Sequence, residues 1–292
     1  MENREVPCNL CGGSRTRLCF RASDLLLHTA HDLAVVKCLD CGLIFLNPQP
    51  DQSRRLDYFP DNYPLYEVAF GRKSADISRY NDRRDRIEAK KSGHTFLDMG
   101  CMDGQMMANL REHGWDVYGF DIKPEAVEFA RTKLGLEKAT VGDLFDQSYP
   151  EKFFDVVDIW GVLEDASDPM ANLKKVRTLL KDDGLLVIAT HNVESPEARF
   201  FGKTWFNLEI PRHLYHFSPA TLRLMLEKAG YKVLEIKHFA SLYVLEMSLL
   251  NRFRRRSLVI NPVLESLVYR PYVALAPRLS SGTMIEAYAV KT

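Results

Sequence analysis

The sequence predicts an α/β protein with a doubly wound, mostly parallel sheet of seven strands, preceded by a small cysteine-rich module. From residue 94 onward, short apolar runs alternate with amphipathic helical segments. Such alternation is typical of parallel strands covered by helices. Five of the six cysteines lie within the first 41 residues, and four of these five form two closely spaced pairs, which sets that segment apart. A chain of 292 residues is long enough for one large domain with an appendage.

The N-terminal cysteines form two pairs, Cys8 with Cys11 and Cys38 with Cys41, each followed by a glycine. Two residues between the thiols let both sulfurs reach one tetrahedral ion at about 2.3 Å. Four thiolates close the coordination sphere, so a structural zinc is favoured over a catalytic one. The alternative is four unliganded thiols. We therefore predict a zinc-ribbon-like module at residues 1–50.

Residues 51–93 are predicted to connect this module to the main domain. The first part is rich in Pro, Asn, Asp and Tyr, a composition that indicates irregular structure. Residues 72–92 are charged and helix-tolerant, which favours a solvated helix.

The main domain is predicted at residues 94–292. Pro124 and Pro169 fit first-turn positions, Asp168 fits an N-cap, and Gly135 fits a helix stop. The predicted strands lie near 95–99, 116–120, 138–141, 154–160, 185–190, 231–236 and 284–290. The predicted helices lie near 104–113, 124–134 and 169–181, with a later one from 218 to 230.

Residues 239–282 are an insertion between the last two predicted strands, and we expect it to be helical. Its leucines, aromatics and the arginine cluster at 252–256 leave three roles open. These are an amphipathic cover over a substrate, the face of a homodimer, and a contact patch for a membrane or a lipid-linked acceptor. A solvated helix end is the commonest reason for such a charge run.

Polar residues follow successive predicted strands at the point where each ends. Asp98 and Gly100 close the first strand, and Gly104 opens the next helix. Asp121 closes the second strand, and Asp143 follows the third. Ligands of a doubly wound sheet bind beyond the carboxyl ends of its strands, where a carboxylate such as Asp121 can accept from both ribose hydroxyls of an adenosine. Asp98 would repel a pyrophosphate, so a cationic adenosine cofactor such as S-adenosylmethionine fits better than a dinucleotide.

These segments resemble, in order and spacing, the motifs of class I S-adenosylmethionine-dependent methyltransferases. The matching stretches include LDMGCMDGQMMANL, GFDIKPEAVEFAR, VGDLFD and PRHLYHFSPATLRLMLEKAGY. The cysteine pairs with CGLIFLNPQP resemble the zinc module of a bacterial branch, often linked with modifying sugars and other cell-surface or secondary metabolites. The resemblance implies a Rossmann-like methyltransferase fold and a cofactor site lined by Asp98, Gly100, Cys101, Gly104, Asp121, Ile122, Asp143, Leu144 and Trp160.

The sequence departs from the family pattern at two places. The glycine loop carries Met102 where relatives commonly have glycine, and a side chain there either restricts the turn or packs between helix and sheet. We favour packing. After the fourth strand, relatives often have Glu-His, whereas this chain has Glu164-Asp165, which removes a histidine from the acid and base candidates.

The resemblance predicts methyl transfer to a small molecule, most readily to a hydroxyl of a sugar-like or other metabolite. Such a hydroxyl needs a base, and the segment EIPRHLYHFS offers His213 first and His216 second, with His191 a weaker candidate. The alternative is that these rings only pack or bind a backbone carbonyl.

Two other functions are weighed against this one. An RNA methyltransferase is disfavoured by the net charge of zero, which gives no general attraction to nucleic acid. A scaffold with a decayed site is the second alternative. We expect a cytoplasmic protein, because the sequence has neither an apolar leader nor a run long enough to span a bilayer.

Overall fold

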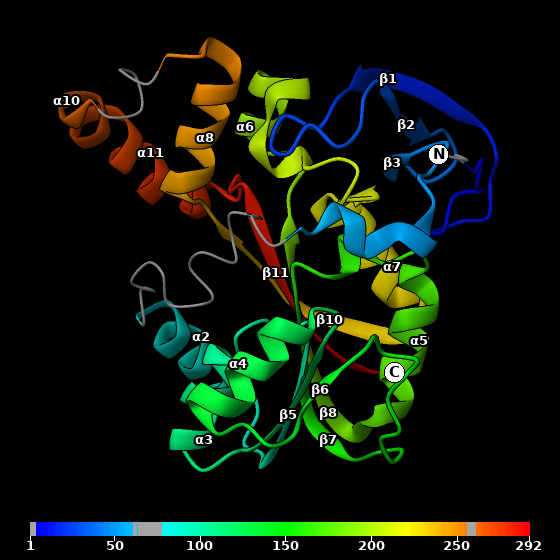
Figure 1. The fold of residues 1–292 in the computed structure, drawn as a ribbon, viewed down its shortest axis with the longest axis vertical. Coiled ribbons are helices and arrows are strands. Elements are labelled where there is room, and N and C mark those ends of the chain that lie inside the picture. The colour runs from blue at the N-terminus through cyan, green and yellow to red at the C-terminus, as the bar shows by residue number, and fades with distance from the viewer. Residues whose placement is uncertain (1–3, 61–62, 64–77, 256–260) are drawn as a thin grey trace.

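Two β-sheets organise the chain in the computed structural model, which describes residues 4–60, 63, 78–255 and 261–292 (Figure 1). The larger sheet has the strand order β10-β11-β8-β7-β4-β5-β6. Its strands are β4 (Thr95–Met99), β5 (Asp116–Asp121), β6 (Ala139–Val141), β7 (Phe154–Trp160), β8 (Leu180–His191), β10 (Tyr231–Phe239) and β11 (Met284–Lys291). Only β11 runs antiparallel to its neighbours in this sheet as described. The prediction of a mostly parallel seven-stranded sheet is therefore confirmed.

Helices cover both faces of the large sheet (Figure 1). One apolar cluster joins a sheet face to α2 (Ser78–Glu88), α3 (Gln105–Glu112) and α4 (Pro124–Leu134). The other cluster joins the opposite face to α5 (Pro169–Leu179) and α7 (Pro219–Lys228), and it continues into the N-terminal segment. The predicted helix 72–92 is described only from residue 78 onward, and 72–77 lie outside the described residues.

Local capping explains most helix boundaries. The Asp168 side chain accepts the Ala171 amide at the start of α5, and Ser218 forms a capping box at the start of α7. Prolines occupy the first turn of α4, α5 and α7. Strand β8 begins at Leu180, earlier than predicted, because Leu180 already pairs with Phe154 of β7. The predicted end of α5 at residue 181 is therefore wrong by two residues.

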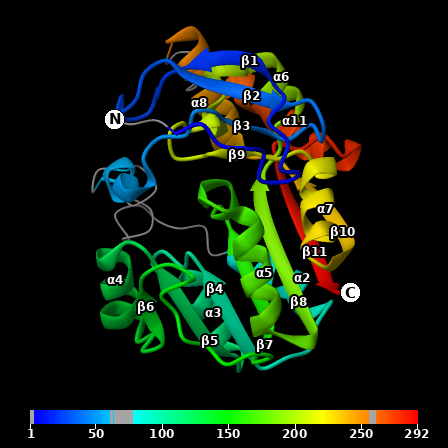
Figure 2. The ribbon, with the colours of Figure 1, turned by 90° about the vertical axis from the view of Figure 1, so that its right-hand side faces the viewer.

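The smaller sheet is antiparallel and has the strand order β1-β2-β3-β9. Its strands are β1 (Thr16–Ala22), β2 (Leu33–Cys38), β3 (Ile44–Leu46) and β9 (Tyr215–His216). Figure 2 shows this sheet beyond the carboxyl end of β8. Because β9 comes from the C-terminal half of the chain, the N-terminal module shares its sheet with the segment that carries the histidine candidates.

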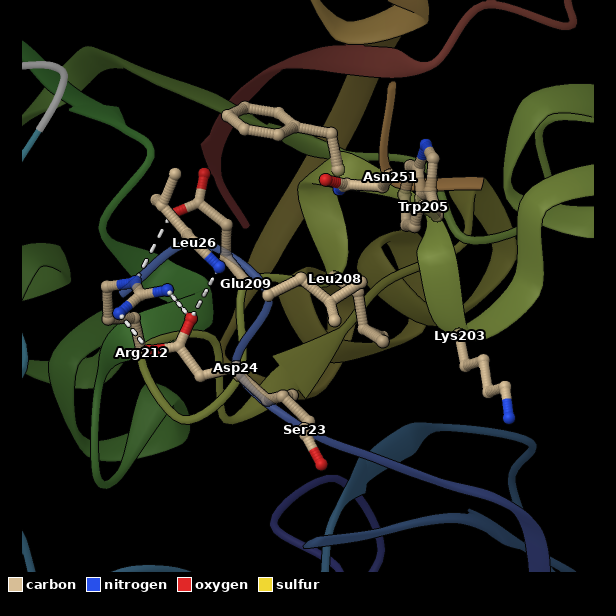
Figure 3. A pocket seen from close by; sticks show the side chains of 12 residues that line it. Ser23, Asp24, Leu26, Lys203, Trp205, Leu208, Glu209, Arg212 and Asn251 are labelled. Atoms are coloured by element: carbon tan, nitrogen blue, oxygen red, sulfur yellow. Dashed lines mark hydrogen bonds and ion pairs between the residues drawn. The ribbon is translucent and has the colours of Figure 1, made fainter. Parts of the chain in front are cut away.

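A buried ion pair also joins the N-terminal module to that segment. The Arg212 guanidinium, 2% exposed, donates to both carboxylate oxygens of Asp24 at 2.8 and 3.2 Å. Figure 3 shows this pair with Glu209 at the edge of a pocket of about 30 Å³. That volume has room for about two water molecules. The pocket is therefore too small for an acceptor molecule.

The described part of the 239–282 insertion is helical, as predicted. It contains α8 (Leu242–Phe253), α10 (Pro262–Leu264), a π-helical turn η5 (Glu265–Tyr269), α11 (Arg270–Leu275) and a 3₁₀ turn η6 (Ala276–Leu279). Helix α8 lies beside α6 (Pro196–Phe201), as Figure 1 shows. Within the described ranges, no helix combines the length and apolar composition needed to cross a bilayer.

The remaining short elements are 3₁₀ turns. They are η1 (Gln52–Tyr58), η2 (Leu163–Asp165), η3 (Gly202–Thr204) and η4 (Phe206–Leu208). Turn η2 follows β7 directly, so it lies at the carboxyl edge of the large sheet.

Candidate active site

The glycine loop between β4 and α3 folds around the end of β5. Gly100 and Gly104 both have positive φ, and a Cβ at either position would collide with a neighbouring side chain. Across the loop, the Asp121 carboxylate accepts the Met102 amide at 2.9 Å and the Lys123 amide at 2.8 Å. The loop therefore approaches the end of β5 closely enough for one carboxylate to organise both segments.

Met102 has φ of 46°, in the left-handed region that non-glycine residues rarely adopt. This conformation lets its amide reach Asp121, so the turn tolerates the side chain. Within the described chain, Met102 is half-buried and is not among the residues that pack against either apolar cluster. Our expectation that Met102 packs between helix and sheet is therefore wrong.

The Asp98 side chain is buried, and its carboxyl group forms no hydrogen bond with the described residues. It pairs in register with Asp158 of β7. Burial, together with the nearby charge of Asp158, raises the pKa of Asp98 well above its ordinary value. A cation bound beside Asp98 would reverse this effect by favouring the charged carboxylate.

The other sequence-predicted cofactor residues lie at the same sheet edge. Asp143, which is exposed, accepts the Phe145 amide at 2.8 Å, and the following Leu144 is buried. Cys101 is buried, whereas Ile122 is half-buried. Trp160 at the end of β7 is 41% exposed, with the Arg83 guanidinium 3.7 Å from its ring centre.

The two histidine candidates lie in different local structures. His213 follows a turn, and His216 lies in β9. His191, the weaker candidate, lies between them: its ring stacks on His213 with centres 4.8 Å apart, and its Nε2 lies 3.0 Å from the His216 Nδ1. His216 is fully buried, and burial lowers its pKa well below the ordinary value.

Two carboxylates from η2 complete this cluster. Glu164 Oε1 lies 3.4 Å from the His191 Nδ1, and Asp165 Oδ1 lies 3.8 Å from the His213 Nε2. Burial raises the pKa of Asp165 to about 7 despite the nearby His213. The Glu164-Asp165 pair, at which the sequence departs from its relatives, therefore contacts the histidine group directly.

Comparison with known protein families identifies the family to which this architecture belongs. A family profile described as a methyltransferase domain matches residues 72–236, more than half of the chain. This chain belongs to the methyltransferase family. Its large sheet, with β11 antiparallel to its neighbours, is the Rossmann-like methyltransferase fold predicted from sequence.

Solved structures share this fold. A SAM-dependent methyltransferase from Archaeoglobus fulgidus matches with a TM-score of 0.55 and 21% identity, over 79% of this chain and 100% of the other. A possible histamine N-methyltransferase from Thermotoga maritima matches with a TM-score of 0.53 and 16% identity, over 82% of this chain and 99% of the other.

A curated relative is closer in sequence. The ubiquinone biosynthesis O-methyltransferase of Cereibacter sphaeroides is 30% identical over 148 residues. The match covers 47% of this methyltransferase and 60% of the relative's length.

The four N-terminal cysteines of this methyltransferase converge on one point, with their sulfurs all within 4.8 Å of one another. The Sγ atoms of Cys8 and Cys41 are 3.4 Å apart, and those of Cys11 and Cys38 are 3.5 Å apart. Tetrahedral Zn–S bonds of about 2.3 Å separate sulfurs by roughly 3.8 Å, so the cluster has the dimensions of a zinc site.

Sequence reasoning missed the basic partners of the buried sheet acids. Arg83 of α2 pairs with Asp158, and Arg86 pairs with Glu286 of β11 at 3.0 Å. The spacing of residues along the chain gives no signal for these contacts, because the charged composition of α2 is typical of a solvated helix. The sequence marks Glu164 only as part of a departure from the family pattern.

Replacing Arg83 with methionine is expected to lower the free energy of unfolding by about 3–5 kcal/mol, because Asp158 would stay buried without its partner. Urea denaturation of both proteins measures the change. Arg79→Met, at an exposed position of the same helix, is the matched control and should cost less than about 1 kcal/mol. Equal stability of the two variants would contradict the prediction.

Proposed function

We propose that this methyltransferase transfers a methyl group from S-adenosylmethionine to a hydroxyl of a small-molecule acceptor. The observation that carries the proposal is Asp121, whose buried carboxylate lies at the end of β5 against the glycine loop. A carboxylate in that position has two acceptor oxygens for the two hydroxyls of a ribose. Gly100 and Gly104 keep the loop free of side chains that would collide with the packing around it.

The residues of this chain would act mainly by binding and orientation. Asp98 and the glycine loop, with Cys101, would hold the methionine part, Asp121 and Ile122 the ribose side, and Asp143 with Leu144 the adenine. Trp160 would lie near the methyl group. The sulfonium supplies an activated methyl group for in-line displacement, so holding donor and acceptor atoms in contact supplies much of the rate.

The acceptor proposed is a sugar-like or other hydroxyl-bearing metabolite. The name of the Cereibacter sphaeroides relative, an O-methyltransferase, supports oxygen as the acceptor atom. Transfer of labelled methyl from S-adenosylmethionine to a panel of sugar-nucleotide and phenolic acceptors tests this proposal. Labelling of nitrogen acceptors alone would exclude it, and absence of S-adenosylhomocysteine binding would leave the scaffold alternative.

Loss of the proposed base should slow turnover without weakening cofactor binding. The Asn207 carbonyl accepts from the His213 Nδ1 at 2.8 Å, which leaves the Nε2 lone pair for a proton. His213→Asn should lower kcat about 10²- to 10⁴-fold. The affinity for S-adenosylhomocysteine should stay unchanged in calorimetry. His31→Asn, at an exposed position of the N-terminal module, is the control, and an unchanged kcat in His213→Asn would rule out the base role.

Binding of S-adenosylmethionine should release protons from Asp98. The free carboxyl has a raised pKa, and a bound cation lowers it, so the complex holds fewer protons. Affinity should therefore rise with pH between the lowered pKa of the complex and the raised pKa of the free protein, and then level off. Asp158, Asp121, Asp103 and Arg83 also act on this carboxyl.

Calorimetry in buffers of different ionisation enthalpy counts the released protons. Asp98→Asn should abolish the release and the pH dependence. Because burial also raises the pKa of Asp103 to about 6, Asp103→Asn is the matched comparison. Proton release that persists in Asp98→Asn and disappears in Asp103→Asn would show that the proton comes from Asp103. That result would contradict the prediction.

We also propose that the cysteine cluster binds one structural zinc ion. Its four sulfurs leave no coordination position for a substrate, so the ion would stabilise the N-terminal module rather than take part in methyl transfer.

A further inference from the structure

The cluster that contains the candidate base His213 has the composition of a metal site. Glu164, His191 and His213 bring one ligand atom each within 4.8 Å of one another. They come from three separate segments: η2, the end of β8, and the turn before β9. Glu164 is 2% exposed and His191 is 1% exposed. The three side chains therefore converge in a largely dry environment.

Two of the converging atoms lack hydrogen-bond partners. Glu164 Oε2 and His191 Nδ1 are buried and have no partner among the described residues. The Nδ1 lies 3.4 Å from the other Glu164 oxygen but is not aligned with it for a hydrogen bond. A buried polar atom without a partner costs about 1–3 kcal/mol. A ligand that accepts electron pairs from both atoms would remove this cost.

In His213 and His191, the ring nitrogen that is not proposed as a metal ligand already has a hydrogen-bond partner. His213 Nδ1 donates to the Asn207 carbonyl at 2.8 Å, so its Nε2 presents a lone pair. His191 Nε2 lies 3.0 Å from the His216 Nδ1, and donation in that direction leaves a lone pair on the His191 Nδ1. Metal-binding histidines are held in this way, with the second N–H given to a neighbouring acceptor.

We propose that Glu164, His191 and His213 bind one divalent transition-metal ion. Two imidazole nitrogens and one carboxylate suit Zn²⁺, Mn²⁺, Fe²⁺ or Co²⁺ and leave coordination positions open. The His213 side chain is 14% exposed, so solvent reaches the cluster at that member. Asp165 Oδ1, which is also buried and unpartnered, lies 3.8 Å from the His213 Nε2 and is within reach of a further ligand position.

A role for this ion in methyl transfer rests on the proposed function. A hydroxyl bound to a divalent cation would lose its proton more readily, which makes it a better nucleophile, and the unpartnered Asp165 carboxylate beside His213 would accept that proton. His213 would then be a ligand instead of the base, because both roles use the same Nε2 lone pair. The metal-binding measurement decides between the two roles.

Titration with Mn²⁺, followed by the electron paramagnetic resonance signal of the free ion, tests the site. Mn²⁺ prefers oxygen and nitrogen ligands, so it does not compete for the four cysteines. The protein, with zinc held by its cysteines, should bind one further Mn²⁺ ion. His191→Ala and Glu164→Gln should each weaken that binding at least tenfold, whereas His31→Ala, at the exposed control position, should not.

Glu164→Gln keeps the size of the side chain, so an unchanged near-ultraviolet circular dichroism spectrum separates loss of a ligand from loss of the fold. No binding of Mn²⁺, Co²⁺ or additional Zn²⁺ to the unaltered protein would overturn the proposal and leave His191 and His216 as a hydrogen-bonded pair beside the Glu164 carboxylate. Unchanged Mn²⁺ affinity in both variants would also overturn it. Because metal binding is measured without cofactor or acceptor, failure of S-adenosylhomocysteine to bind would reject the proposed function alone.

Discussion

Asp121→Asn is expected to weaken the binding of S-adenosylhomocysteine about 100-fold or more. The variant keeps the shape of the side chain but loses its charge, and charge-assisted hydrogen bonds contribute about 1.5–3 kcal/mol each. Loss of two such bonds to a ribose amounts to about 3 kcal/mol at least, which corresponds to roughly two orders of magnitude in Kd. Isothermal titration calorimetry measures the change.

A matched control lies at the opposite end of the same strand. Asp116 is half-exposed, pairs with Lys138, and is far along β5 from the glycine loop. Asp116→Asn should bind S-adenosylhomocysteine like the unaltered protein. Because Asp121 also holds the Met102 and Lys123 amides, thermal unfolding of both variants is needed alongside. If Asp121→Asn is folded and binds normally, the adenosine does not lie at this sheet edge.

Cys38→Ser is expected to release zinc and unfold the N-terminal module. Cys38 is buried at the end of β2, and its sulfur lies with the other three within 4.8 Å. Structural zinc contributes about 10–16 kcal/mol of apparent binding energy to zinc-finger peptides, so even part of that is a large loss. The midpoint of thermal unfolding should fall by roughly 10 °C or more.

Unfolding of the N-terminal module in Cys38→Ser should also disturb the histidine cluster. Strand β9, which carries His216, pairs with β3 of the module, so unfolding of the module removes the partner of that strand. Elemental analysis should find one zinc fewer per chain in Cys38→Ser than in the unaltered protein. Cys19→Ser, which alters an exposed cysteine outside the cluster, should keep the zinc and the stability. Equal zinc content in Cys38→Ser and in the unaltered protein would exclude the four-cysteine site.

The order of the elements follows from local signals. Pro124, Pro169 and Ser218 mark helix starts, and Gly135 ends α4 with a φ of 64°, as expected from the sequence. Parallel strands place their carboxyl ends at one edge, so the positions of Asp98 and Asp121 could also be predicted without coordinates. The role of helix α2 cannot be predicted in the same way, because Arg83 is buried against Asp158, whose position far along the chain gives no local signal.

The sequence by itself determined the alternating strands and helices, the two cysteine pairs and the acids at successive strand ends, because periodicity, capping and short spacings act over a few residues. Only the tertiary structure decided which histidines meet. His191 and His213 stack because β8 ends beneath the turn that leads into β9, and β9 is positioned by β3, about 170 residues earlier. Side chains from segments so far apart are brought together by sheet register and packing, which no local pattern encodes.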